Sequence, residues 1–327
     1  MSALVSIDKL TVQFRGDRGW VSAVDDVSFD IGEGECVGVV GESGSGKSVT
    51  ALSMLRLHPR GAARFPSGSI VYAGIDLLRA PERDLRAVRG RDIAMVFQDP
   101  MSSLNPVLTI CDQICEPLRL HQGLSQAAAR RRAIDLLGLV RIPDAAHRVD
   151  EYPHRLSGGM RQRAMIAIAI ACRPRLLVAD EPTTALDVTI QAQILELLRD
   201  LRNELGMAVL LISHDLGVIA EFARRVLVMY AGRIVEDAPV EVLFSAPLHP
   251  YTEGLMASTP TLESSADRLY AIPGRIPDPD ELIPGCRFGP RCPHVEPICR
   301  ANAPELVAIG RTHRVRCTPR APPGVLS

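Results

Sequence analysis

Short apolar runs alternate with amphipathic stretches along the first 246 residues. Val37 to Val40 is an apolar run that leads into glycines, as a buried strand does. Similar runs follow it: Ile70–Tyr72, Ile93–Phe97, Leu176–Ala179, Val209–Ile212 and Val226–Met229. Because helical patterns lie between these runs, we expect a largely parallel α/β sheet.

The clearest predicted helix runs from Thr189 to Leu205, with its apolar positions on one face and Gly206 as its stop. The opening stretch has a different pattern and predicts antiparallel strands: Val5, Ile7, Leu10, Val12 and Phe14, then Val24, Val27, Phe29 and Ile31. Residues 109–172 are predicted to be mainly helical. They indicate a helical subdomain, about 99–172, inserted within the α/β core.

The last part of the chain has a different composition. Residues 247–327 hold 14 of the 25 prolines and four of the eight cysteines. Such a density of proline rules out long helices there. We therefore expect two domains, with a core over 1–246 and a small Pro/Cys-rich extension over 247–327.

Composition and charge restrict the function further. The chain has 327 residues, 46% hydrophobic and 23% charged, as a soluble globular protein has. A net charge of −1 gives no electrostatic reason to expect nucleic acid as the main ligand. The longest apolar run, Ala164–Cys172, is too short for a membrane span, and the N-terminus lacks a signal-peptide pattern. We expect a cytosolic protein.

The segment Gly41-Glu-Ser-Gly-Ser-Gly-Lys-Ser48 fits the phosphate-binding pattern GxxxxGK[ST]. Its glycines let the backbone fold around phosphates with N–H groups pointing inward. Lys47 can reach the β- and γ-phosphates, and the Ser48 hydroxyl can bind Mg²⁺. An apolar strand precedes the loop and an apolar-periodic helix follows. The predicted nucleotide-binding residues here are Gly41, Glu42, Ser43, Gly44, Ser45, Gly46, Lys47, Ser48 and Val49.

A second apolar strand ends in two carboxylates, in Arg175-Leu-Leu-Val-Ala-Asp-Glu181. By itself, such an Asp-Glu pair would be interpreted as a solvated strand end. In a chain that has a P-loop, we interpret Asp180 as part of the Mg²⁺ shell and Glu181 as the general base for the attacking water.

Just upstream, Leu156-Ser-Gly-Gly-Met-Arg-Gln-Arg163 places a Ser and two glycines at the start of a helix, which leaves N–H groups for an anion. One subunit does not need a second anion site of this type. Two subunits that face each other head to tail would need such a site, because each completes the nucleotide pocket of the other. The chain here resembles the ATPases of ABC transporters, whose signature motif is this segment. The resemblance implies contacts with the facing subunit's ATP from Leu156, Ser157, Gly158, Gly159 and Met160.

Other motifs of that family match in order over residues 4–245. Gln98 resembles the Q-loop glutamine, which contacts Mg²⁺ and senses the membrane subunit. Ala185-Leu-Asp187 resembles the D-loop, with Asp187 acting across the dimer. His214 resembles the switch histidine at the γ-phosphate. The implied catalytic set is Glu181, His214, Gln98 and Lys47, with Mg²⁺ held by Ser48, Gln98 and Asp180.

Two aromatic residues are candidates for stacking on adenine. Phe14 ends the first strand, where the family usually places this aromatic, but it is equally a candidate core residue. Trp20 is the alternative.

Narrower motifs resemble the ATPases of the oligopeptide, dipeptide and nickel permease group: Phe97-Gln-Asp-Pro-Met-Ser-Ser-Leu-Asn-Pro106, Tyr152-Pro-His-Arg-Leu-Ser-Gly-Gly159, His249-Pro-Tyr-Thr252, and Cys-Arg-Phe-Gly-Pro-Arg-Cys-Pro at 286–293. The resemblance implies an ATP-hydrolysing importer subunit on the cytoplasmic face of the membrane. Its partners would be two permease subunits, a second and paralogous ATPase, and an extracytoplasmic binding protein. Peptides are the expected solute and nickel or another small solute is the alternative. A non-transport ABC ATPase is disfavoured, because the chain has one cassette and no coiled-coil insertion.

Four cysteines of the extension form a candidate metal site: Cys286, Cys292, Cys299 and Cys317. Four thiolates can hold a [4Fe–4S] cluster or Zn²⁺, although the spacing matches neither the ferredoxin nor the zinc-ribbon pattern. Some members of the resembling group carry an iron–sulfur cluster at such a pattern. The remaining alternative is reduced, unligated thiols. The other cysteines, in apolar surroundings, are interpreted as core or helix-face residues: Cys36, Cys111, Cys115 and Cys172.

Overall fold

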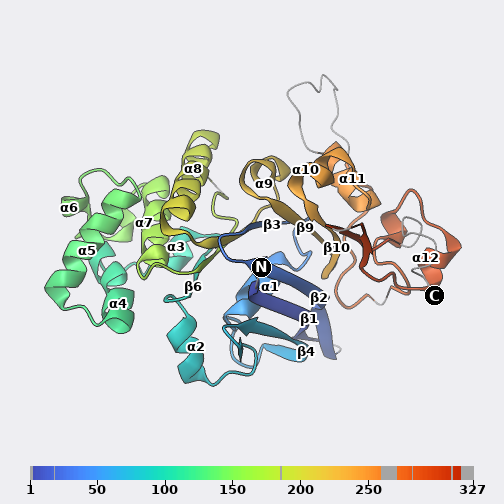
Figure 1. Ribbon diagram of the computed structural model, residues 1–327, viewed down its shortest axis with the longest axis horizontal. Helices are drawn as coiled ribbons and strands as arrows, with labels where there is room; N and C mark the ends of the chain where they lie inside the picture. The colour runs from blue at the N-terminus through green and yellow to red at the C-terminus, as the bar shows by residue number, and fades with distance from the viewer. Residues whose placement is uncertain are drawn as a thin grey trace. The chain divides into compact units, whose positions relative to one another are not determined.

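The computed structural model describes residues 3–17, 19–184, 186–258, 271–281, 283–310 and 312–317. These residues divide into two compact units. The first contains residues up to 31, residues 36–79 and residues from 212 onward, and the second contains residues 32–35 and 80–211. Figure 1 shows the strands and helices of both units.

One sheet of the first unit has the strand order β2-β1-β4-β5. Its strands are β1 (Ala3–Gly16), β2 (Gly19–Gly32), β4 (Ala63–Tyr72) and β5 (Ile75–Asp76). Strand β4 runs antiparallel to β1, with Val5 opposite Tyr72 and Ile7 opposite Ile70. The run Ile70–Tyr72 therefore belongs to this antiparallel sheet and not, as predicted, to the parallel one. A three-residue apolar run has the same pattern in both kinds of sheet.

Five more strands of the first unit lie in the order β11-β12-β10-β9-β3. Strand β3 (Cys36–Val40) is parallel to β9 (Arg225–Tyr230), and β10 (Arg233–Pro239) is antiparallel to β9. The tail supplies β11 (Val307–Ile309) and β12 (His313–Val315), and β12 pairs with β10. The tail is thus hydrogen-bonded to this sheet.

Short helices accompany these strands. The structure has α1 (Lys47–Met54), α9 (Leu216–Phe222), α10 (Val240–Ser245), α11 (Pro250–Ala257), α12 (Pro297–Ala301) and the 3₁₀ turn η2 (Gly289–Arg291). Helix α9 packs closely on β3, because a Cβ atom built on Gly38 would lie 2.6 Å from Ile219 Cγ2. The described part of the tail holds helices of at most eight residues, in line with its proline content.

The second unit holds strands in the order β8-β7-β6, with β6 parallel to β7. Their bounds are β6 (Ile93–Val96), β7 (Leu176–Asp180) and β8 (Ala208–Ile212). Its helices and turn are α2 (Glu82–Val88), α3 (Pro100–Ser103), α4 (Ile110–Gln122), α5 (Gln126–Leu139), α6 (Ala145–Arg148), η1 (Pro153–Arg155), α7 (Gly158–Ile170) and α8 (Val188–Leu205). Residues 109–172 are mainly helical, as predicted.

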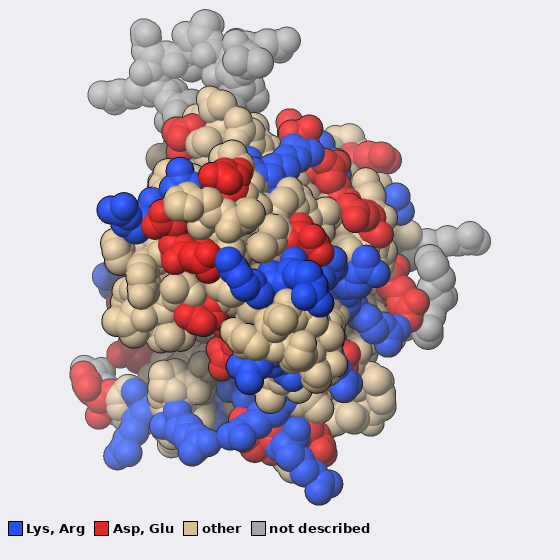
Figure 2. All heavy atoms as spheres, turned by 90° about the vertical axis from the view of Figure 1, so that its left-hand side faces the viewer, with Lys and Arg blue, Asp and Glu red and all other residues tan. Residues whose placement is uncertain are grey.

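Local signals fix the ends of these helices. Thr109 and Asp112 form a capping box at the start of α4, and Asp187 caps α8. Gly206 ends α8 in a left-handed conformation, with a φ of 66°. On the face shown in Figure 2, basic and acidic side chains are interspersed among the other residues. None of the described helices combines the length and the apolar character that a membrane span needs.

Candidate functional site

The P-loop connects β3 to α1 through a tightly confined backbone. Gly41 and Gly46 have φ values of 152° and 101°. A Cβ atom would lie 2.2 Å from Met229 O at Gly41 and 2.9 Å from Ala23 O at Gly46. These positions therefore require glycine. The hydroxyl of Ser45 is buried in this loop and has no hydrogen-bond partner among the described residues, so the loop fits a phosphate that would accept from it.

Lys47 is 5% exposed and its Nζ donates to two carbonyls of the loop, at 2.7 Å to Gly41 and 2.9 Å to Glu42. The cation thus lies over the loop that the pattern assigns to phosphate. Ser48 and Val49 lie in the first turn of α1 and are half-buried. The structure therefore places the eight residues of the predicted motif in one loop and helix start.

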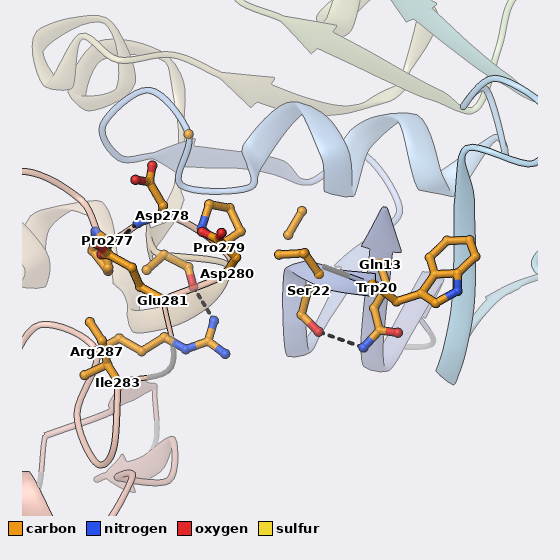
Figure 3. A pocket seen from close by; sticks show the side chains of 15 residues that line it. Gln13, Trp20, Ser22, Pro277, Asp278, Pro279, Asp280, Glu281, Ile283 and Arg287 are labelled. Carbon is orange, nitrogen blue, oxygen red and sulfur yellow. Dashed lines mark hydrogen bonds between the residues drawn. The ribbon is translucent and has the colours of Figure 1, made fainter. Parts of the chain in front are cut away.

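A cavity of about 580 Å³ lies beside Gly44 (Figure 3). Trp20 lines it, and the guanidinium of Arg64 lies 4.4 Å from the centre of the Trp20 ring. Phe14 is absent from the lining of this cavity and packs edge-on against His58, with ring centres 5.2 Å apart. Of the two aromatic candidates, Trp20 is the one in the cavity.

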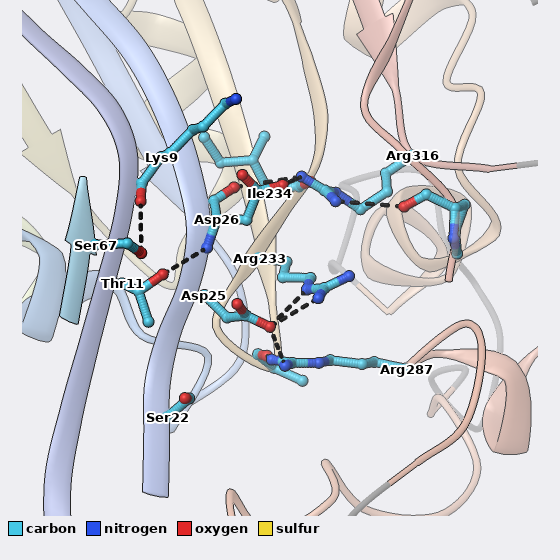
Figure 4. A network of polar contacts seen from close by, with 12 residues as sticks. Lys9, Thr11, Ser22, Asp25, Asp26, Ser67, Arg233, Ile234, Arg287 and Arg316 are labelled. Atoms are coloured by element: carbon cyan, nitrogen blue, oxygen red, sulfur yellow. Dashed lines mark hydrogen bonds and ion pairs between the residues drawn. The ribbon is translucent and has the colours of Figure 1, made fainter. Parts of the chain in front are cut away.

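The tail contributes one wall of the same cavity. Figure 3 shows Asp278, Pro279 and Asp280 among the lining residues, together with Arg287. Arg287 forms an ion pair with Asp25, which also pairs with Arg233 at 2.7 Å (Figure 4). These contacts join the tail to β2 and β10.

His214 lines a second cavity, of about 480 Å³, together with Gly41 of the P-loop. Leu255 and Ser258, on and just after α11, line it too. The structure therefore brings the predicted switch histidine and the start of the P-loop to one cavity.

In the second unit, two predicted catalytic side chains are in contact. Gln98 Nε2 donates to Glu181 Oε2 at 3.0 Å, and Thr184 Oγ1 donates to the same oxygen at 2.9 Å. Glu181 has a φ of 46°, a left-handed conformation that costs free energy for a residue with a side chain. Asp180, one residue earlier at the end of β7, is 5% exposed. The carboxylate of Glu181 is thus oriented by two donors.

The predicted signature segment forms the start of α7. The Ser157 hydroxyl accepts from the Met160 N–H at 3.3 Å, while Leu156 is buried just before it. A Cβ atom on Gly159 would lie 3.0 Å from Ile190 Cγ2 of α8, whereas one on Gly158 would lie 3.9 Å from Leu186 Cδ2, an ordinary contact. Asp187 accepts from the Ile190 N–H at 2.9 Å. Ala185 of the predicted D-loop lies outside the described residues.

The four tail cysteines line one small cavity, of about 30 Å³, with His249, Phe288 and His294. Burial raises the pKa of the Cys286 thiol. Among the described residues, no three His, Cys, Asp or Glu side chains stand in a metal-binding arrangement. The cavity is therefore a shared site of four thiols, without a formed ligand cage.

Comparison with known proteins now decides the family. The ABC transporter family matches residues 24–184, and the family described as the C-terminal region of oligopeptide/dipeptide transporters matches residues 235–299. A Brucella abortus protein named for peptide import and ATP binding is 58% identical, over 98% of this chain and 96% of its own. The chain belongs to the ATP-binding subunits of ABC transporters.

Further relatives of this ABC ATPase agree. The oligopeptide transport ATP-binding protein AppD of Bacillus subtilis is 51% identical, over 97% of both chains. A solved ATP-binding cassette, a post-hydrolysis dimer bound to ADP and Pi, has a TM-score of 0.65 and 29% identity over 72% of this chain and 98% of its own. The predicted family, the α/β fold class and ATP hydrolysis by a transporter ATPase are confirmed.

Sequence reasoning missed several residues of this ABC ATPase that contact the P-loop or its cavities. They are Tyr251, Arg287, Arg291 and the segment 277–281. Tyr251, Arg287 and Arg291 lie in motifs already quoted, His249-Pro-Tyr-Thr252 and Cys-Arg-Phe-Gly-Pro-Arg-Cys-Pro at 286–293. The motifs identified the branch of the family but gave no sign that their Tyr and Arg contact the P-loop.

Proposed function

We propose that this ABC ATPase powers the uptake of oligopeptides or dipeptides across the cell membrane. The observation that carries the proposal is the presence, in one chain, of an ATP-binding cassette and the C-terminal region of oligopeptide/dipeptide transporters. Relatives named for peptide import and for oligopeptide transport support it along nearly their whole length. Nickel or another small solute is the alternative cargo within the same group.

In the proposed site, Lys47 and the P-loop amides bind the β- and γ-phosphates. Glu181 accepts a proton from the attacking water, and Gln98, its hydrogen-bond partner, helps to orient it. His214 contacts the γ-phosphate, and Trp20 stacks on adenine in place of Phe14. Phosphates would draw Lys47 from the loop carbonyls that it contacts here.

Mg²⁺ is expected with ATP in this family, and the donor chemistry suits it. The hydroxyl of Ser48, the amide of Gln98 and the carboxylate of Asp180 offer the oxygen ligands that Mg²⁺ prefers. The ion neutralises charge on the phosphates when bound.

The segment 156–160 and Asp187 act in trans in this proposal. Two ATPase subunits, this chain and a paralogue, enclose two nucleotides between P-loop and signature segments. The subunits sit on the cytoplasmic face of the membrane against two permease subunits, which receive solute from an extracytoplasmic binding protein. A higher affinity of the closed pair for ATP drives closure, and hydrolysis reverses it.

Replacing Glu181 with Gln tests the catalytic assignment. The variant should lose ATP turnover by about a hundredfold or more, because general-base catalysis contributes roughly that factor, yet retain ATP binding. Thr184→Ala, which removes the other donor to the same oxygen, serves as the control and should retain most of the turnover. Wild-type turnover in Glu181→Gln would refute the assignment.

Transport by the whole complex tests the solute. Membrane vesicles that contain the permeases, both ATPases and the binding protein should accumulate labelled di- or oligopeptides only with ATP. Accumulation of Ni²⁺ without peptide uptake would establish the alternative.

A further inference from the structure

Arg291 is a tail residue whose side chain is almost fully enclosed, with 5% exposed. Its guanidinium binds the Glu42 carboxylate through two hydrogen bonds, of 3.0 and 3.1 Å. The remaining donors reach the carbonyls of Pro273 and Ile272 and the hydroxyl of Tyr230. Burial opposes the charge, but the bonds to Glu42 and Tyr230 outweigh it and raise the pKa of Arg291. Two parallel hydrogen bonds to one carboxylate form a fork that the planar guanidinium of Arg provides and the ammonium of Lys does not.

Glu42, the second residue of the P-loop, is held at every polar group. Its N–H donates to Tyr251 Oη at 2.8 Å, and its carbonyl accepts from Lys47 Nζ and from the Ser45 N–H. Its carboxylate is bound by Arg291. Two of these contacts come from the tail. Tyr251 lies on α11, where it is fully buried, and Arg291 is the last residue of η2. The tail thus fixes both the backbone and the side chain of one P-loop residue.

The same part of the tail forms the cysteine cavity. Arg291 immediately precedes Cys292, at the end of η2. Phe288, which lines the cavity, packs against Tyr230 and Tyr251 with ring centres 5.2 and 5.5 Å apart. Packed aromatic rings with few voids transmit small displacements. The four cysteines and the P-loop are therefore linked by one residue and one aromatic cluster.

We infer that Arg291 is a positioning residue of the nucleotide site, through which the four-cysteine segment of the tail holds the P-loop ready to bind phosphate. The inference rests on the proposed function, because it assigns a role within the same ATP site. A loop that is fixed before binding loses less conformational entropy when the nucleotide arrives, so its affinity is higher. Arg291 contacts no phosphate in this role and acts through Glu42.

The test is ATP affinity, measured with a fluorescent ATP analogue on the reduced full-length chain. Arg291→Ala should raise the dissociation constant by about tenfold or more, because the loop must then be ordered on binding. Arg291→Lys should give an intermediate value, since it keeps the charge but loses the fork. In steady-state turnover, KM for ATP should rise while kcat at saturating ATP stays within about twofold, as expected for lost ground-state ordering.

Arg300→Ala is the matched control. Arg300 lies in the same tail, immediately after Cys299 as Arg291 lies before Cys292, but it is exposed and its side chain makes no ion pair or hydrogen bond within the described part of the chain. The dissociation constant of the Arg300→Ala variant for the ATP analogue should equal the wild-type value. An equal loss in Arg300→Ala would show that any change in the tail weakens binding and would overturn the specific role.

A double-mutant cycle with Glu42→Gln keeps the inference falsifiable if Arg291→Ala weakens the fold. If Arg291 acts through Glu42, the double variant should bind ATP no more weakly than the weaker single variant. Additive losses would overturn the inference, as would wild-type affinity in Arg291→Ala at an unchanged melting temperature. A wild-type chain that binds no ATP would instead refute the proposed function, so the two failures are distinguishable.

Discussion

At the scale of single residues, the aromatic neighbours of the P-loop yield an optical prediction. Trp20 is the only tryptophan of the chain and lines the cavity beside Gly44. ATP should therefore change the intrinsic tryptophan emission, because a stacked base alters the surroundings of the indole. Trp20→Ala should also weaken ATP binding by about fivefold to tenfold, in keeping with roughly 1–1.5 kcal/mol for an aromatic pair.

Phe14→Leu is the control for that measurement. Phe14 packs on His58, so its replacement should lower the melting temperature and preserve the emission change. An unchanged emission at saturating ATP in the wild-type chain would contradict the stacking role of Trp20.

The residues that sequence reasoning found are those whose chemistry demands a fixed local spacing. A phosphate loop needs its glycines and lysine within eight positions, so residues 41–48 are recognisable without a structure. Arg291 and Tyr251 act on the same loop across separations of 249 and 209 residues. Such a contact leaves no local pattern, and only the fold brings its members together.

At the scale of elements, alanine substitutions at two glycines are predicted to have opposite effects on the stability of the fold. Gly38→Ala should destabilise the fold by about 1–3 kcal/mol, because the new Cβ would lie 2.6 Å from Ile219 on a buried strand. Gly138→Ala is the matched change within α5, where nothing lies within 4 Å of the new Cβ. It should stabilise the chain by about 0.5–1 kcal/mol through the higher helix propensity of alanine.

Chemical denaturation of the two variants measures both effects. A neutral Gly38→Ala would mean that α9 can move away from β3 without cost, contrary to the close packing described here.

Elements with a clear apolar pattern were predicted well, including the short strands β3, β6, β7, β8 and β9, whereas elements without such a pattern were not. The helix predicted from Thr189 to Leu205 corresponds to α8, because the apolar stripe and the Gly206 stop signal both indicate a helix over these residues. Strands β10, β11 and β12 were missed. In β10, Glu236 and Asp237 are buried, which breaks the apolar pattern on which a strand prediction depends. Asp237 forms ion pairs with Arg225 and Arg314, and Glu236 Oε1 lies 2.7 Å from His313 Nε2, so two of the three partners lie in the tail.

At the scale of the whole molecule, the tail offers a compositional test. Its four cysteines line one cavity, although among the described residues no three potential ligands stand in a metal-binding arrangement, so the [4Fe–4S] cluster or Zn²⁺ expected from the sequence remains a prediction for metal analysis. Such a cluster would supply a rigid cross-link and a redox-active group when bound. The four residues that would hold it are Cys286, Cys292, Cys299 and Cys317.

Purification without oxygen, followed by iron, sulfide and zinc analysis, measures the content. About four irons and four sulfides per chain would support the cluster, and one zinc would support the alternative. Cys292→Ser should reduce the bound metal, whereas Cys111→Ser, a change at a buried helix position of the second unit, should not. Neither iron nor zinc in the wild-type chain would leave the cysteines as thiols and refute the metal prediction.

The distance along the chain between Glu42 and Arg291 has a consequence for synthesis. The two residues are 249 positions apart, so a ribosome that adds about 5–20 residues per second completes the P-loop roughly 10–50 s before it reaches Arg291. During that interval the nascent P-loop lacks the tail contacts that order it. Until Arg291 has been added, the nascent P-loop should therefore bind nucleotide more weakly than that of the finished subunit. This timing would disfavour ATP binding, and the pairing with a partner subunit that depends on it, in chains that have not yet reached Arg291.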